Sequence, residues 1–273
     1  MDTFLYHYTD FIGLDGILTK EGIRLCDIQS MNDKKEMEYF LLRLEDSIKL
    51  RFEKNGYEDK IKEVQDIFVN QKNKREQCTA FAACFSELRD DAAQWERYGK
   101  NGQGVSIGFN ESKLREITNK RARLQPVYYE ADVSNHEFVN LFEEIFSYGL
   151  PRKGFETIDG LFDNIYECTM AFKHPSFKAE KEVRLSRVTE KKGTLRGLGE
   201  RKFLITSTNI KGYYTIDLKE CCRKENIKMD ELVTEIIIGP KSMQSIESLK
   251  VYLNRNGLDM LENKVKKSDC PLR

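Results

Sequence analysis

The sequence predicts one α+β domain over its 273 residues, with helices inserted between the strands of a mainly antiparallel or mixed sheet. Three observations lead to this prediction. Short apolar and aromatic runs typical of strands occur near both ends of the chain. Charged segments with helical periodicity separate them, without the regular strand–helix alternation of a parallel sheet. A hydrophobic fraction of 40% supplies enough apolar side chains for a core.

The chain opens with a strand, a helix and a second strand. Residues 3–8 form a short aromatic run that predicts a strand. Asp10 is a typical helix-capping residue and stands directly before an amphipathic segment, so we expect a helix from residue 11 onward. Gly22 ends this helix, and residues 23–26 predict the second strand.

A long, highly charged segment from about 34 to 75 has a helical pattern, which Asn55-Gly56 interrupts. We expect this segment to be a helical insertion or lid on the sheet. Residues 78–86, CTAFAACFS, are apolar and small and predict a buried strand.

The rest of the chain mixes helices and strands. A short helix holding Trp95 and Tyr98 leads into a glycine-rich turn. Further helices are expected at about 133–149, 157–173 and 243–255, and strands at 105–109, 122–130, 182–188, 202–208, 213–217, 234–239 and the C-terminus.

The composition excludes several classes of protein. Basic and acidic residues balance at 45 each, which excludes a polycation and an acidic tail protein. The seven cysteines are an odd number without a Cys-x-x-Cys spacing, and only three histidines accompany them, so we expect reduced thiols and no metal site. There is no signal-peptide pattern and no apolar run of about 18 residues, which predicts a cytoplasmic protein without a membrane span.

No P-loop, GxSxG, HExxH or EF-hand pattern occurs. The glycines from Gly102 onward precede a strand, whereas a Rossmann glycine loop opens a helix, so we expect a turn with a close backbone approach. Basic side chains gather at Lys113, Arg115, Lys120, Arg121 and Arg123, and again at Arg187, Lys191, Lys192, Arg196, Arg201 and Lys202. Either cluster can contact phosphates, although interleaved glutamates favour an ordinary solvated surface.

Polar residues mark the ends of two predicted strands. His7 and Thr9 end the first strand, where they can hydrogen-bond a ribose and an amide, although a half-buried histidine at a sheet edge is the commoner case. Ser86 ends the strand 78–86, where its hydroxyl can brace a catalytic carboxylate or stabilise a turn.

Glu180 and Glu182 stand at the start of a predicted strand, and the two-residue period places both carboxylates on one face. Such a pair suits catalysis, but this spacing is common in a glutamate-rich chain. Two carboxylates so close repel each other unless they are solvated or separately hydrogen-bonded. We expect variants that replace either one to stay folded, because exposed or cleft carboxylates rarely hold a fold together.

Three of these features follow the order of the ADP-ribosyltransferase superfamily: a histidine on the first strand, a serine on a middle strand and a glutamate on a later strand. Residues 5–25 resemble the opening of poly-ADP-ribose polymerases, RNA 2′-phosphotransferases and DarT-type toxins, through His7, Thr9, Ile17-Leu18 and Gly22. The segments Cys84–Ser86 and Glu180–Glu182 resemble the serine strand and the ExE motif of the toxin branch.

The wider pattern, from about residue 4 to 240, resembles a bacterial family of unknown function. The matching motifs are Met31-Asn32-Asp33, Cys84-Phe85-Ser86, Trp95 with Tyr98, Gly104 to Phe109, and Glu180 to Arg184. Two positions depart from the resemblance. Val183 replaces an aromatic residue, and His7 stands where arginine-modifying toxins carry arginine, so the acceptor class is not inherited.

The resemblance implies a split ADP-ribosyltransferase-like sheet and an enzyme that uses NAD as its substrate. It implies that Glu182 stabilises an oxocarbenium-like ribose, that Glu180 orients or deprotonates the acceptor, and that Ser86 braces Glu182. The implied NAD-binding residues are His7, Tyr8, Thr9, Asn32, Ser86, Trp95 and Tyr98, of which Tyr8, Trp95 or Tyr98 would stack on the nicotinamide.

The expected function is therefore mono-ADP-ribosylation of a macromolecule, with nucleic acid slightly favoured over protein as the acceptor. By analogy the protein would be a bacterial toxin or anti-phage effector, with an antitoxin as a further partner. Two alternatives are an NAD glycohydrolase, in which water is the acceptor, and a non-catalytic ligand-binding module that keeps the fold.

Overall fold

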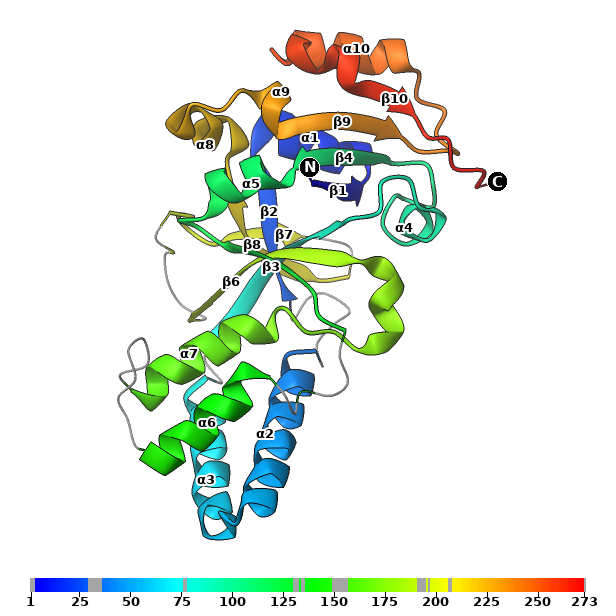
Figure 1. Ribbon diagram of the computed structural model, residues 1–273. Helices are drawn as coiled ribbons and strands as arrows, with labels where there is room; N and C mark the ends of the chain where they lie inside the picture. Colours follow the sequence, from blue (N-terminus) through cyan, green and yellow to red (C-terminus); the bar gives the residue numbers. More distant parts are fainter. Residues whose placement is uncertain are drawn as a thin grey trace.

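The computed structural model describes residues 3–28, 36–75, 78–129, 133, 136–148, 157–190, 195, 197–205 and 208–272. Over these residues the chain forms an α+β fold around one mixed, mostly antiparallel open sheet (Figure 1), as predicted. The strands are β1 (Phe4–Thr9), β2 (Ile23–Asp27), β3 (Cys78–Ser86), β4 (Val105–Asn110), β5 (Arg123–Pro126), β6 (Glu182–Glu190), β7 (Lys202–Ile205), β8 (Ile210–Ile216), β9 (Val233–Ile238) and β10 (Val265–Lys267).

Strand β3 organises the sheet. It pairs with β6 over its whole length, from Cys78 opposite Glu190 to Ser86 opposite Glu182. Its other edge is divided, because β2 pairs around Ala82 and β1 pairs only at Ser86. One arm of the sheet therefore continues through β2, β8 and β7, and the other through β1, β4, β9 and β10. Among the pairs of named strands that the structure describes, only β9 and β10 run parallel.

The positions of the helices agree with the sequence prediction where the helical periodicity extends over many residues. They are α1 (Phe11–Asp15), which continues as a π-helix (Gly16–Lys20), α2 (Glu36–Asn55), α3 (Glu58–Arg75), α4 (Ala92–Arg97), α5 (Glu111–Thr118), α6 (Glu137–Tyr148), α7 (Ile158–Thr169), α8 (Leu218–Glu225), α9 (Met229–Leu232) and α10 (Ile246–Arg255), with 3₁₀-helices at Pro175–Glu180 and Asp259–Lys264. The predicted helix around Trp95 ends at Arg97, with Tyr98 as its C-cap.

Local chemistry explains the first elements. Asp10 caps α1, because its Oδ1 accepts a hydrogen bond from the Gly13 amide at 2.8 Å. Gly22 has φ of 87°, and a Cβ atom there would lie 2.0 Å from the Ile216 carbonyl oxygen. Only glycine fits this turn without strain, and the turn brings β2 beside β8.

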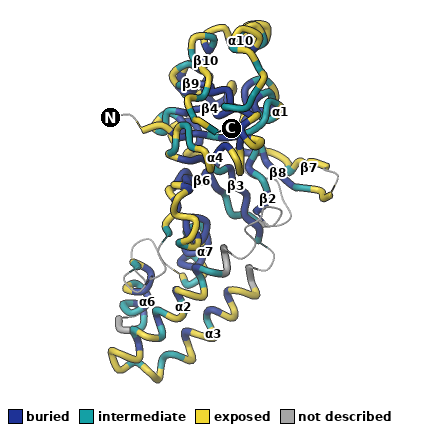
Figure 2. Tube along the Cα trace, turned by 90° about the vertical axis from the view of Figure 1, so that its right-hand side faces the viewer, coloured by how far each residue is buried: buried dark blue, intermediate teal, exposed yellow. Residues whose placement is uncertain are grey.

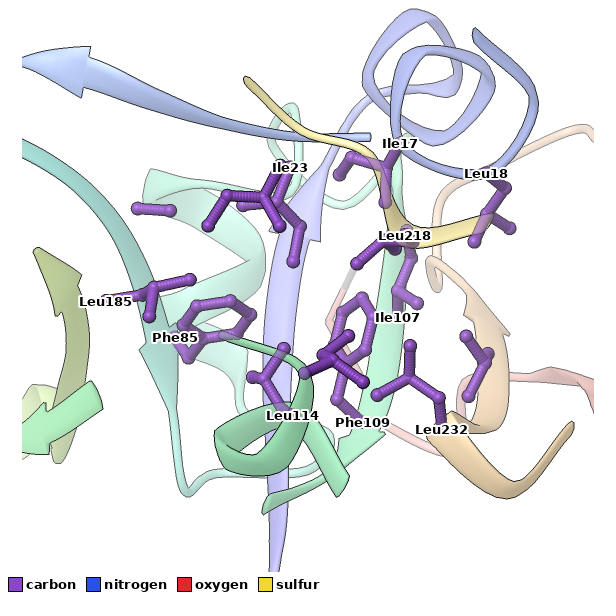
Figure 3. Packing of buried hydrophobic residues seen from close by; sticks show 14 of the residues in the cluster. Ile17, Leu18, Ile23, Phe85, Ile107, Phe109, Leu114, Leu185, Leu218 and Leu232 are labelled. Atoms are coloured by element: carbon purple, nitrogen blue, oxygen red, sulfur yellow. The ribbon is translucent and has the colours of Figure 1, made fainter. Parts of the chain in front are cut away.

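The hydrophobic residues form two large clusters. The sheet cluster joins both arms of the sheet to α1, α5, α8, α9 and α10. In Figure 3, Phe85 and Leu185 of the paired strands β3 and β6 lie near Leu114 of α5, and Leu232 of α9 packs toward the same core. This burial holds β3 and β6 rigidly at the centre of the fold.

The second set, which we call the helical cluster, is built from α2, α3, α6 and α7 and runs from Phe40 to Phe172. Figure 1 shows α2, α3 and α6 extending away from the sheet, with α7 nearest to β6. The helical pattern expected at about 34–75 corresponds to α2 and α3, and α6 and α7 complete the core of these helices.

The β7 end of the sheet is uncovered. All four residues of β7 are exposed, and Figure 2 shows the β7–β8 hairpin projecting from the body of the protein. None of the helices that the structure describes has both the length and the apolar character needed to cross a bilayer.

Candidate functional site

A small pocket lies where β1, β3 and β6 meet. Its open volume is about 120 Å³. We call it the glutamate pocket; its lining residues are Tyr6, His7, Tyr8, Cys84, Phe85, Ser86, Gln94, Tyr98, Lys173, Glu180 and Glu182. Six residues singled out in the sequence, from segments far apart along the chain, thus meet in one place: His7, Tyr8, Ser86, Tyr98, Glu180 and Glu182.

The backbone around the two glutamates differs from the prediction. Glu182 is the first residue of β6, but Glu180 ends a 3₁₀-helix, so the expectation that both lie on one strand is wrong. Pro175 starts this short helix, and His174 caps it by accepting a hydrogen bond from the Ser176 amide at 3.2 Å. Lys181 between the glutamates has the left-handed φ of 43°. This turn, rather than strand alternation, brings the two carboxylates to the same pocket.

Glu182 is buried and held by two cations. Nε and Nη2 of Arg184 donate to its two carboxylate oxygens at 2.7 and 3.1 Å, and Nζ of Lys173 lies 3.1 Å from Oε2. Burial raises the pKa of this carboxyl, but the charges and hydrogen bonds of Arg184 and Lys173 outweigh it and lower the pKa to about 2. Glu182 is therefore ionised at neutral pH.

Glu180 shares one of these cations. Nζ of Lys173 lies 2.8 Å from Oε2 of Glu180, while Nη1 of Arg97 and the hydroxyl of Tyr98 donate to Oε1 at 2.8 and 3.1 Å. Lys173 therefore bridges the two carboxylates, and its ammonium group also lies 4.8 Å from the centre of the Phe177 ring. Only 5% of Glu180 and 7% of Glu182 is exposed, so these pocket carboxylates are buried rather than solvent-exposed.

The lowered pKa of Glu182 predicts sensitivity to acid. Its folded-state pKa of about 2 lies below the ordinary 4.5, so its contribution to stability is present above pH 4.5 and is lost as the pH falls toward 2. We expect the free energy of unfolding in urea to fall across this range more steeply for the wild type than for Glu182→Gln. Equal pH dependence in the two proteins would contradict the ionised, cation-paired state.

Ser86 supports the backbone of the site. Its hydroxyl donates to the Glu180 carbonyl oxygen at 2.7 Å and accepts from the Leu88 amide at 3.1 Å. The second bond is the turn role considered from the sequence. The structure thus places the hydroxyl on the backbone next to the glutamates rather than on the Glu182 carboxylate, although Ser86 and Glu182 are direct partners across β3 and β6.

His7 is oriented by a backbone carbonyl. Its Nδ1 lies 2.9 Å from the Cys84 carbonyl oxygen, which can only accept, so Nδ1 carries the proton. Burial lowers the pKa of His7 below 6.5, although the bond to Cys84 opposes this shift. The ring is then neutral at pH 7, and its Nε2 is a hydrogen-bond acceptor.

The candidate aromatic residues lie in different environments. Tyr8 lines the pocket, and its hydroxyl donates to the Leu88 carbonyl oxygen at 2.7 Å. Tyr98 is 48% exposed at the pocket, and its hydroxyl donates to Oε1 of Glu180. Trp95 is fully buried, packs edge-on against Tyr8 and donates to Asp90 at 2.6 Å, outside the pocket lining. Of the three aromatic candidates, Tyr8 and Tyr98 therefore line the pocket, together with Tyr6 and Phe85.

Two further residues, Thr9 and Asn32, were predicted to bind NAD. Thr9 ends β1 outside the pocket lining, and Asn32 lies outside the described residues. The glycine turn near Thr9 behaves as predicted: a Cβ atom on Gly104 would lie 2.1 Å from the Thr9 carbonyl oxygen. These glycines therefore allow two backbones to pack closely.

Sequence reasoning missed the cations. Lys173, Arg97 and Arg184 surround the glutamates, yet none was predicted to belong to the site. Arg184 had a usable signal, because it lies two residues after Glu182 on the same face of β6. Tyr129 was also missed; its hydroxyl accepts from the Glu182 amide at 2.8 Å. Lys173 carried no signal, because only tertiary packing brings its chain segment over the pocket.

Comparison with known protein families gives a match over part of the chain. Residues 94–185, about a third of the chain, match the model of a family described as a protein of unknown function (DUF2971). The matched segment runs from α4 to the start of β6 and includes Lys173 and both glutamates, but not His7 or Ser86. No curated protein and no solved structure matches the chain.

Proposed function

We propose that the protein is an NAD-dependent ADP-ribosyltransferase that modifies a macromolecule, with nucleic acid favoured over protein. The observation that carries the proposal is the meeting of His7, Ser86 and Glu182 in one pocket. They come from β1, β3 and β6, which are neighbours in the sheet. This is the order of the three motifs that resemble the ADP-ribosyltransferase superfamily.

The chemistry requires a carboxylate beneath the ribose. Nicotinamide leaves NAD as a neutral group, so the main barrier is positive charge on the ribose, as in glycoside hydrolysis. Glu182 supplies an ionised carboxylate in a largely water-free place, where charge stabilisation is strongest. Glu180, which is nearer the exposed Arg97 and Tyr98, would orient or deprotonate the acceptor.

The first strand offers groups for NAD itself. The neutral His7 ring presents Nε2 as an acceptor for a ribose hydroxyl. One edge of β1 pairs with β4, and the other edge pairs with β3 only at Tyr6. Within the described residues, no strand therefore pairs with this second edge from His7 to Thr9. Backbone groups near Tyr8 are therefore available to hold the nicotinamide amide.

NAD binding under this proposal requires the pocket to open. About 120 Å³ holds a few water molecules but not a dinucleotide. Tyr98 and Arg97 form an outer wall of partly exposed side chains, and opening the pocket requires their hydrogen bonds to Glu180 to break. Lys173 must also release Glu182, and the positive charge that develops on the substrate would take its place.

A second candidate is a ligand-binding module without catalysis. Three cations, Lys173, Arg184 and Arg97, already neutralise two carboxylates. Such a network also suits a purely structural site. NAD glycohydrolysis, with water as the acceptor, uses the same pocket as the transferase.

Two measurements separate these functions. Purified protein incubated with NAD should release nicotinamide, followed by chromatography, and no release would favour the binding module. NAD labelled on its adenine, added to a cell lysate, should transfer label to a macromolecule. Sensitivity of the label to nuclease or to protease identifies the acceptor, and release without transfer identifies a glycohydrolase. A nuclease-sensitive product in a bacterial cytoplasm would be consistent with a toxin or anti-phage effector under antitoxin control.

The role of His7 gives a separate expectation. His7→Ala should weaken NAD binding by about two- to tenfold, the scale of one uncharged hydrogen bond, and leave the maximal rate of nicotinamide release nearly unchanged. His7→Gln should restore part of the affinity, because an amide can donate to the Cys84 carbonyl and still accept from a ribose. Calorimetry on the folded variants measures the affinity. An affinity unchanged in His7→Ala would remove His7 from the site.

A further inference from the structure

A larger groove lies behind the glutamate pocket. Its volume is about 700 Å³, within the usual range of small-molecule sites. We call it the arginine groove. It is lined by the C-terminal end of α5, by β5, by the start of α6, by the end of α7 and by Arg187 of β6.

A thin wall separates the two sites. The Tyr128 amide donates to the Ala171 carbonyl at 2.6 Å, and the Lys173 amide donates to the Tyr128 carbonyl at 3.1 Å. Tyr128 and Phe172 line the groove, while the next residues, Tyr129 and Lys173, contact the glutamates from the other side. The two sites are thus back to back.

Both basic clusters seen in the sequence reach this groove. Arg115 and Arg123 come from the first cluster and Arg187 from the second. Arg115 is already engaged, because it donates to the Leu124 carbonyl and to Glu111, both at 2.7 Å. Arg123 lies on an exposed position of β5 and contacts the Cys168 thiol.

Among the three arginines that line the groove, Arg187 differs in its interactions. It is half-buried, yet within the described part of the chain its guanidinium makes no hydrogen bond or ion pair. Arg187 lines the groove, and the planar donors of its guanidinium match the oxygens of a phosphate. Arg187 and Arg123 both line the groove, where their guanidinium groups can donate to an anion.

The other residues that line the groove indicate which class of ligand fits it. Tyr128 is 49% exposed and offers a ring on which a base can stack. Glu137 and Glu167 also line the groove, so its charge is not uniformly positive and a polyanion lying along its whole length is disfavoured. Carboxylates can instead accept from the amino group of a base.

We propose that the arginine groove binds one nucleotide of a single-stranded nucleic acid, with its phosphate on Arg123 and Arg187 and its base against Tyr128. This binding requires neither NAD nor the glutamates. Nucleic acid bound in this groove would also be the acceptor of the proposed ADP-ribosyl transfer. Only this last step rests on the proposed function.

The test is fluorescence anisotropy of a fluorescein-labelled 12-nucleotide RNA or DNA strand, without NAD, between 50 and 200 mM salt. Arg123→Gln and Arg187→Gln should each weaken binding by about five- to tenfold and lower the slope of log affinity against log salt by about 0.7. Tyr128→Ala should cost about tenfold. Arg223→Gln is the matched control, because Arg223 is an exposed arginine of α8 outside the groove, and should bind as the wild type.

Three results would overturn the proposal: no strand binding at 50 mM salt, equal binding by the wild type and both arginine variants, or an equal loss in Arg223→Gln. Competition by a mononucleotide as effective as the strand would assign the groove to free nucleotides instead. Competition by NAD with the same response to the arginine variants would place the dinucleotide there. Because NAD is absent from the binding assay, a failure of nicotinamide release leaves this result unaffected.

Discussion

Glu182→Gln is expected to lower the rate of nicotinamide release by about 10²–10³-fold, the scale of losing one preorganised charge-stabilising group. Glutamine keeps the volume but removes the charge that would stabilise the ribose cation. Glu180→Gln should keep part of the NAD hydrolysis and lose transfer, because its carboxylate is on the side of Arg97 and Tyr98, toward the acceptor. Nicotinamide release and label transfer are measured in parallel on both variants.

The ion pairs require a control for folding. Each carboxylate is buried among cations, so its replacement leaves an uncompensated charge and lowers stability as well as activity. Activities are therefore compared at a temperature where circular dichroism shows both variants to be folded. If folded Glu182→Gln cleaves NAD like the wild type, the enzyme proposal is wrong and the binding module is favoured.

Arg184→Met is expected to destabilise the fold by about 3–5 kcal/mol, the cost of removing one partner of a buried ion pair. Arg184 and Glu182 have 3% and 7% of their side chains exposed, so water cannot replace the lost partner. For a chain of this size the melting temperature should fall by roughly 10 °C. Urea unfolding of the purified variant measures the change.

Arg97 supplies the matched control. It also pairs with a buried glutamate, but its own side chain is 53% exposed, so Arg97→Met should cost about 1 kcal/mol or less. The double variant Glu182→Leu with Arg184→Met should regain part of the lost stability, because an apolar pair carries no uncompensated charge. Equal losses in Arg184→Met and Arg97→Met would show that burial does not govern this network.

Long sequence patterns predicted the fold well. The apolar run 78–86 is β3 with the same limits, and Asn55-Gly56 separates α2 from α3. The helices α5 and α8 were missed because each has only eight residues, too few for a clear periodicity. Their caps were readable: Asn110 and Asp217 both accept from amides three residues later.

The two glutamates of the candidate site could be predicted from the sequence, but the basic side chains that pair with them could not. Ser86 and Glu182 were singled out at strand ends and His7 near the end of the first predicted strand, and the order of the three resembles a known superfamily. The 3₁₀-helix before Lys181 was not found, because a left-handed lysine has no local signature of the kind that glycine gives. The position of Lys173 depends on the segment that joins α7 to β6, and its distance from the carboxylates follows from packing alone.

The two hydrophobic clusters have a consequence for synthesis on the ribosome. The helical cluster is complete once Phe172 has emerged, whereas the sheet cluster needs Val265 near the end of the chain. Domains tend to fold as units as the nascent chain lengthens. The helical cluster can thus form while β6 to β10 are still inside the ribosome or unmade. The glutamate pocket needs β1, β3 and β6 together, so the pocket can assemble only after β6 has emerged, when the helical cluster can already be in place.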